Sequence, residues 1–295
     1  MAPKKSAREK EFTALRPTHA FFPPGLNREA TVKLERAAAS DWNEHGATVC
    51  HPAAFSRLES GDARIFSCFV VAGLVPPMSL FFHAVLAAYT LHVAHLHPNA
   101  VLLLAMFQHC CEAFVGIHPN VALFRHFFRP RVEAGRVSGL VAFTRRTNTS
   151  RFVPMELRNK WEEFRHQWCF VRFPAADDSL LPPTEAPSNF EGWDNLGDRD
   201  EEFAPTYTRI EALCERGLTG RHVVLDFLRC VIAPLQLRSH PMWAYEGESD
   251  RTRLRGAYSQ QEEIELTKMF LQILFGGESS LTFPAGILPL HRDPQ

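Results

Sequence analysis

The sequence predicts an α+β fold that is mainly helical, with a small antiparallel sheet in the middle of the chain. Three patterns lead to this class: apolar residues at helical spacing over residues 79–128, short aromatic and β-branched runs over residues 137–173, and a second helical pattern over residues 206–277. The chain has 295 residues, of which 45% are apolar, and this is enough for one sizeable core or two smaller ones.

A basic tail, residues 1–26, precedes the first predicted element and is expected to be disordered; the alternative for its PKKSAREK stretch is a nuclear-import signal. Asn27 lies where it caps a helix over REATVKLERAAA. The longest apolar run, residues 100–107, has eight residues against the ~20 of a membrane-spanning helix, so no membrane partner is expected. Seven cysteines, an odd number, indicate a reduced nuclear or cytoplasmic protein rather than a disulfide-linked secreted one.

Three predicted helices form a helical unit over residues 79–128. Ser79 supplies an N-cap for the amphipathic helix LFFHAVLAAY, and LHVAHLH follows as an extended link. Pro98 opens a second helix, because its missing N–H would be unpaired in a first turn, and Gly116 ends that helix. A third short helix, NVALFRHFF, stops before Pro130.

The period of the apolar pattern changes after the helical unit. GLVAFT, RFVPMEL and WCFVRF are short β-branched or aromatic runs separated by polar turns, and they predict one small antiparallel sheet over residues 137–173. We assign the helical unit and this sheet to a single domain, residues 27–176.

Beyond that domain we predict an exposed acidic linker, residues 177–205. Residues 177–211 contain ten acidic residues and two arginines, which gives a net charge of −8. The C-terminal helical segment follows, with Thr219 capping RHVVLDFLRCVI and a capping box of Ser259 and Glu262 opening a last helix. Residues 278–295 are predicted to form an irregular tail.

Histidines and cysteines are concentrated in residues 92–128, which contain six histidines and two adjacent cysteines. His95 and His97 alternate as metal ligands on a strand do, but no C-x2-C or H-x3-H pair completes a tetrahedral set. We interpret His109 and Glu112, three residues apart, as a surface pair, and Cys110 as part of an apolar helix face. The pattern favours helix packing, and we predict no metal site and no cofactor.

Residues 125–151 contain seven arginines and one acidic residue, Glu133, which gives a net charge of +6. Phenylalanines lie between the arginines. Arginine pairs with phosphates and aromatic rings stack on bases, so this segment is the candidate nucleic-acid-binding site. The alternatives are that the acidic linker folds back onto it, or that both are solvated faces. The candidate residues are Arg125, Arg129, Arg131, Arg136, Arg145, Arg146 and Arg151.

No catalytic residue is predicted. The chain contains no G-x-S-x-G elbow, no glycine-rich phosphate loop and no H-E-x-x-H pair. The adjacent Asp177 and Asp178 lie in a proline-flanked polar stretch, where such carboxylates are usually solvated turn residues.

Several motifs are spaced along the chain. They are GL-x-PP at residues 73–77, L-x-PN at 96–99, CEAF-x-GI-x-P at 111–119, LFRHFF at 123–128, W-x-FV at 168–171 and PLQ-x-R-x-HPMW at 234–243. With these motifs the chain resembles, over residues 60–245, the plant gypsy-type transposon family, whose grass members carry the label of a gypsy-type transposase domain.

The resemblance implies a gag-like, non-enzymatic protein of a gypsy-type LTR retrotransposon that acts by self-association or weak nucleic-acid binding. No catalytic residue carries over, because the matching positions are apolar residues, prolines and helix ends. The chain also lacks the C-x2-C-x4-H-x4-C zinc knuckle of gag and the aromatic-x-D-D motif of reverse transcriptase. Two alternatives remain: a metal-dependent DNA-processing transposase with carboxylates gathered around Mg²⁺, and a remnant or domesticated protein–protein adaptor.

Overall fold

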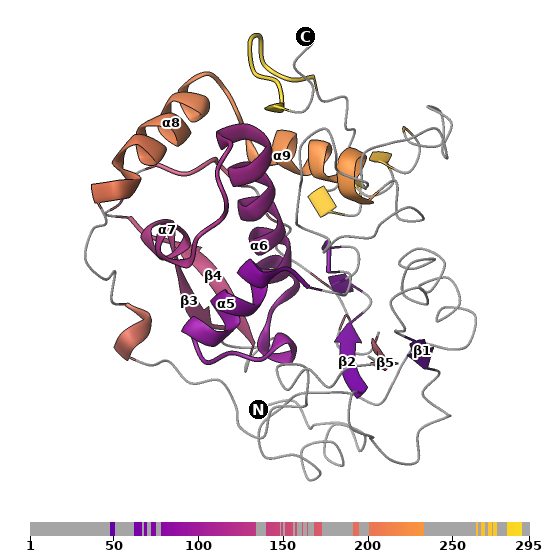
Figure 1. The fold of residues 1–295 in the computed structure, drawn as a ribbon. Coiled ribbons are helices and arrows are strands. Elements are labelled where there is room, and N and C mark those ends of the chain that lie inside the picture. The colour runs from indigo at the N-terminus through magenta and orange to yellow at the C-terminus, as the bar shows by residue number, and fades with distance from the viewer. Residues whose placement is uncertain are drawn as a thin grey trace, which may run out of the picture.

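The architecture is given by a computed structural model (Figure 1). It describes residues 48–50, 62–66, 68–69, 72–74, 78–133, 140–147, 149, 151–155, 157, 161, 164, 168–172, 191–194, 201–232 and 282–290, and seven residues between 264 and 275. The predicted tail, the helix after Asn27, the capping box of Ser259 and Glu262, most of the acidic linker and Arg136 lie outside these residues. The mainly helical α+β class is confirmed.

The helical unit begins as the sequence predicts. The side chain of Ser79 accepts a hydrogen bond from the backbone N–H of Phe82 and caps α5, Leu80–Ala88. The link after it is less extended than predicted, because a short 3-10 turn, Val93–His95, interrupts it. α6, Pro98–Cys110, then starts at the predicted proline and continues as a π-helical turn, Cys111–Val115, that ends at Gly116 with a φ of 78°.

The third predicted helix ends one residue earlier than expected. α7, Val121–Phe127, is capped by Asn120, whose side chain accepts from the N–H of Ala122. Phe128 is not helical but opens a strand, β3, Phe128–Val132. Pro130 explains this, since a proline removes a helical hydrogen bond and pushes the backbone before it into the extended region.

The single sheet predicted over residues 137–173 is wrong in its pairing. β4, Val141–Arg145, pairs antiparallel with β3 in a two-stranded sheet. β5, Trp168–Arg172, instead pairs with β1, Thr48–Cys50, and β2, Asp62–Phe66, in a second sheet. Residues 151–155, within the RFVPMEL run, form no strand. Figure 1 shows the two sheets on different sides of α6.

The C-terminal helices cover α6 and α7. α8, Ala204–Glu215, follows a 3-10 turn, Glu201–Phe203, and buries Ile210 and Cys214. α9, Gly220–Phe227, is capped by Thr219 as predicted and continues as a π-helical turn, Leu228–Ile232. Among residues 264–275, all seven described positions have helical backbone.

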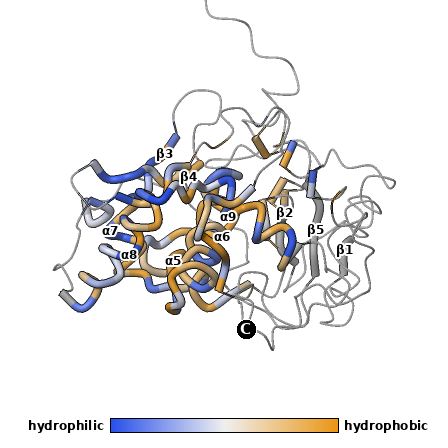
Figure 2. Tube along the Cα trace, turned by 90° about the horizontal axis from the view of Figure 1, so that it is seen from above, coloured by the Kyte–Doolittle hydropathy of each residue, from blue (hydrophilic) through white to orange (hydrophobic). Residues whose placement is uncertain are grey.

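A core of phenylalanine rings surrounds α6. Phe107, fully buried, has its ring within 6.3 Å of the rings of Phe81, Phe124, Phe128 and Phe152. The continuous helical segment Pro98–Val115 is long and apolar enough to cross a membrane, but 89% of it is buried inside the protein, as in a core helix. Figure 2 shows the same arrangement, with the hydrophobic α6 in the middle of the described part and the hydrophilic β3 at its edge.

Candidate functional site

The structure separates the six candidate arginines that it describes instead of gathering them on one face. Arg129 and Arg131 lie on the exposed face of β3, because its residues alternate between buried and exposed. Arg145 pairs with Phe128 across the two strands and so lies on the other face from Arg129, which pairs with Thr144. Arg146 is buried, Arg151 is exposed and Arg125 is half-buried.

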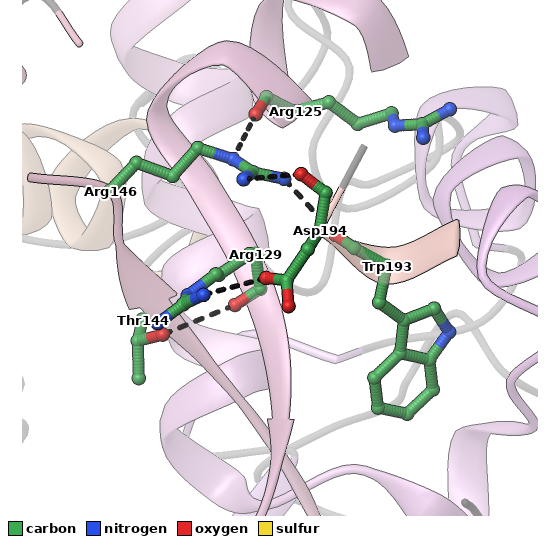
Figure 3. Close-up of polar contacts among 6 residues, drawn as sticks. All are labelled: Arg125, Arg129, Thr144, Arg146, Trp193 and Asp194. Atoms are coloured by element: carbon green, nitrogen blue, oxygen red, sulfur yellow. Dashed lines mark hydrogen bonds and ion pairs between the residues drawn. The ribbon is translucent and has the colours of Figure 1, made fainter. Parts of the chain in front are cut away.

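Arg146 is held by three backbone carbonyls. Its Nε donates to the carbonyl of Arg125 at 2.8 Å, and its Nη1 and Nη2 donate to the carbonyls of Asp194 and Trp193 at 3.0 Å each (Figure 3). Burial lowers the pKa of Arg146, and the neighbouring Tyr89 and Asp194 oppose that shift. A guanidinium remains charged throughout the physiological range, so this side chain acts as a charged clamp on the backbone of residues 193–194.

The clamped residues belong to a short stretch, residues 191–194, that we call the strap. Its Trp193 is 5% exposed, and its indole N–H donates to the carbonyl of Tyr89, at the end of α5, at 3.2 Å. The rings of Trp193 and Tyr89 meet edge to face at 6.5 Å. The linker predicted to be exposed is therefore buried at Trp193, which anchors the strap, while Gly192 and Asp194 on either side of it are exposed.

Arg129 binds the acidic side chain of the strap. Its Nη1 lies 2.6 Å from Oδ1 of Asp194, and the two side chains are 49% and 67% exposed (Figure 3). Arg131 makes a second ion pair, at 2.9 Å, with Glu133 on its own strand end. Both pairs are solvated, so each contributes about 0–1 kcal/mol to the stability of the fold.

Arg125 lies between the strap and Tyr89. Its Nη2 donates to the carbonyl of Gly192 at 3.4 Å, and its guanidinium carbon lies 5.6 Å from the centre of the Tyr89 ring. Burial raises the pKa of Tyr89 to about 12, although Arg125 and Arg146 both lower it. The Tyr89 hydroxyl therefore stays protonated up to high pH, although two cations lie near it.

The other two described arginines, Arg145 and Arg151, do not lie on the exposed face of β3. Burial raises the pKa of Cys214 on α8, and Arg151 and Arg145 oppose this rise. The backbone N–H of Arg151 also donates to Oε1 of Glu211 at 3.1 Å. The predicted arginine-rich segment is therefore divided. Arg129 and Arg131 lie on the exposed face of β3, Arg125 and Arg146 bind the backbone of the strap, and Arg151 contacts α8.

The predicted surface pair of His109 and Glu112 is wrong. His109 is 1% exposed, and its Nε2 lies 2.9 Å from Oδ2 of Asp226, which is fully buried in α9. The thiol of Cys230 donates to the other oxygen of Asp226 at 3.6 Å, and Glu112 accepts from Gln108 instead. Because α6 is buried on nearly every side, His109 faces α9 rather than water.

Other histidines within residues 92–128 act as local caps. Nδ1 of His92 accepts from the N–H of Ala94, and Nδ1 of His97 accepts from the N–H of Asn99 at the start of α6. Cys110 and Cys111 are buried free thiols. Within the described part of the chain, no three His, Cys, Asp or Glu side chains gather where they would hold a metal ion.

Three residues, Trp193 and Asp194 in the strap and Tyr89 beside it, were not among the candidate site residues predicted from the sequence. Trp193 carried a signal, since a tryptophan inside an acidic, otherwise polar stretch has no local apolar face to join. Asp194 and Tyr89 carried none that distinguishes them, because their roles depend on contacts with Arg129 and Arg125 across the fold.

Comparison with protein families gives one match. Residues 65–132 match the family model described as "Putative gypsy type transposon". This is a transposon-related protein. The match runs from the end of β2 to the end of β3 and includes Arg125, Arg129 and Arg131, whereas β4 and the strap lie outside it. It confirms the resemblance over 65–132 only, a shorter stretch than the 60–245 read from the motifs.

No curated protein and no solved structure matches the chain.

Proposed function

We propose that this transposon-related protein is a gag-like, non-enzymatic component of a plant gypsy-type element that binds nucleic acid through the exposed face of β3. The observation that carries the proposal is the alternation in β3, which leaves Arg129 and Arg131 on one solvent-exposed face. Two residues apart on a strand, they lie about 7 Å from each other along one line. Such a row of guanidinium groups suits successive backbone phosphates.

The binding is expected to be weak and to depend on salt. The chain carries a net charge of −1, so attraction comes from a local patch rather than from the whole surface. Ion pairs already engage Arg129 and Arg131, and a phosphate must compete with both carboxylates. A nuclear or cytoplasmic location, as the free buried thiols favour, is part of the same proposal.

A fluorescence anisotropy titration with a single-stranded oligonucleotide of about 20 nucleotides tests this proposal. Each arginine–phosphate contact adds about 0.7 to the salt slope of the binding constant, so Arg129→Ala with Arg131→Ala should flatten the slope by about 1.4. The matched control is Arg145→Ala with Arg151→Ala, which removes equal charge away from the exposed face of β3. Binding that ignores salt, or that falls only in the control, contradicts the proposal.

Self-association is the second half of the gag-like role and needs a separate measurement. Light scattering after size exclusion should find large assemblies for a gag-like protein and a small defined complex for a protein–protein adaptor. The rival DNA-processing enzyme predicts strand cleavage that requires Mg²⁺, which a plasmid nicking assay detects.

A further inference from the structure

The strap and β3 meet at one contact that bears on nucleic-acid binding, and the inference drawn from it rests on the proposed function. Asp194 places a carboxylate on Arg129, with Oδ1 at 2.6 Å from Nη1. A carboxylate and a phosphate present the same kind of charged oxygen acceptor to a guanidinium group. Asp194 therefore occupies the position on Arg129 that a backbone phosphate would take.

Two parts of the strap are held with very different strength. Trp193 is 5% exposed and donates to the carbonyl of Tyr89, and Arg146 binds the carbonyls of residues 193 and 194 from a buried position. The Asp194 side chain, by contrast, is 67% exposed, and an exposed ion pair is easily exchanged. Displacing the carboxylate does not require the strap to leave its anchor.

We infer that Asp194 is a built-in competitor for phosphate, fixed beside Arg129 by the Trp193 anchor and the Arg146 clamp, so that it lowers the affinity of the β3 face for nucleic acid. The anchor keeps the competitor at a high local concentration. Arg131 is subject to the same kind of competition from Glu133, which lies on its own strand end. The strap differs because it comes from a segment 65 residues away in the sequence.

Asp194→Asn is the decisive variant. It removes the charge, keeps nearly the same shape, and leaves the backbone carbonyls of residues 193 and 194 in place for Arg146. We expect the oligonucleotide to bind about two- to fivefold more tightly, the range that one exposed ion pair allows. The salt slope should stay close to that of the unmodified protein, because Arg129 contacts a phosphate in both complexes once the carboxylate is displaced.

Two further variants make the result specific. Glu215→Gln, at the exposed C-terminal end of α8, removes one negative charge without touching Arg129, so it should leave both affinity and slope close to those of the unmodified protein. Arg129→Ala combined with Asp194→Asn should show no gain over Arg129→Ala alone. Equal thermal unfolding midpoints for all variants show that the fold is intact.

The outcomes separate the inference from the proposed function. Salt-dependent binding that Asp194→Asn leaves unchanged, or that Glu215→Gln strengthens equally, overturns the inference and leaves the proposed function standing. If neither the unmodified protein nor Asp194→Asn binds the oligonucleotide, both are wrong. Binding that becomes measurable only in Asp194→Asn supports both.

Discussion

The interior around α6 and the arginine-bearing surface of β3 are built by opposite means. Around α6, phenylalanine rings pack in an apolar core, and the buried pair of His109 and Asp226 joins α6 to α9 within it. On the surface, the strap is bound by guanidinium groups to carbonyls and a carboxylate, over sequence separations of 47 to 67 residues. Most of the stability therefore resides in the first region, while in the second the exposed ion pair of Arg129 and Asp194 can exchange its partner.

The largest effect is expected in the core. Phe107→Ala removes a ring that touches four other phenylalanines and leaves a cavity, and it should lower the free energy of unfolding by about 3–5 kcal/mol. Leu80→Ala is the control, since Leu80 is 87% exposed. Urea unfolding followed by circular dichroism measures both. Similar losses in the two variants would refute the placement of the core.

The next effect comes from the polar pair inside that core. Asp226→Ala leaves His109 buried beside α9 without its carboxylate, and we expect a loss of about 3 kcal/mol. The double variant with His109→Ala should cost clearly less than the two single changes together, because both remove one interaction. Strict additivity in this cycle would show that the two side chains do not interact.

The contribution of Tyr89, which lies between the core and the strap, to the free energy of unfolding should depend on pH. Tyr89 has a pKa of about 12 in the folded protein against about 10 in an unfolded chain, so the folded state keeps its proton longer. Its contribution is complete below pH 10 and is lost as the pH rises towards 12, a loss of about 2 kcal/mol. Tyr89→Phe should not show this part of the alkaline loss. Parallel alkaline profiles for both proteins would contradict it.

The smallest effects distinguish two arginines of the surface itself. Arg146→Lys cannot reach three carbonyls with one ammonium group, and we expect a loss of about 1–2 kcal/mol. Arg129→Lys keeps its charge near the exposed Asp194 and should change stability by less than about 0.5 kcal/mol. Thermal unfolding of the two variants side by side gives the comparison. Equal destabilisation would mean that the strap is held by its carboxylate rather than by its backbone.

The sequence anticipated local features well because neighbouring residues decide them. The Ser79 cap, the Pro98 start and the Gly116 end each follow from the chemistry of one residue in its own turn, and the structure confirms all three. The fold class and the burial of Cys110 on an apolar helix face follow from the same local patterns.

Tertiary structure alone decided the partners across the fold. β5 joins β1 and β2 rather than β4, His109 turns to Asp226 rather than Glu112, and the strap docks on Arg129 and Arg146. The sequence pattern specifies which face of a helix or strand is apolar, but that face can pack equally well against many other apolar surfaces. The selection among them depends on how all elements pack at once, because the free energy of a long-range contact also includes the ordering of the chain between its ends.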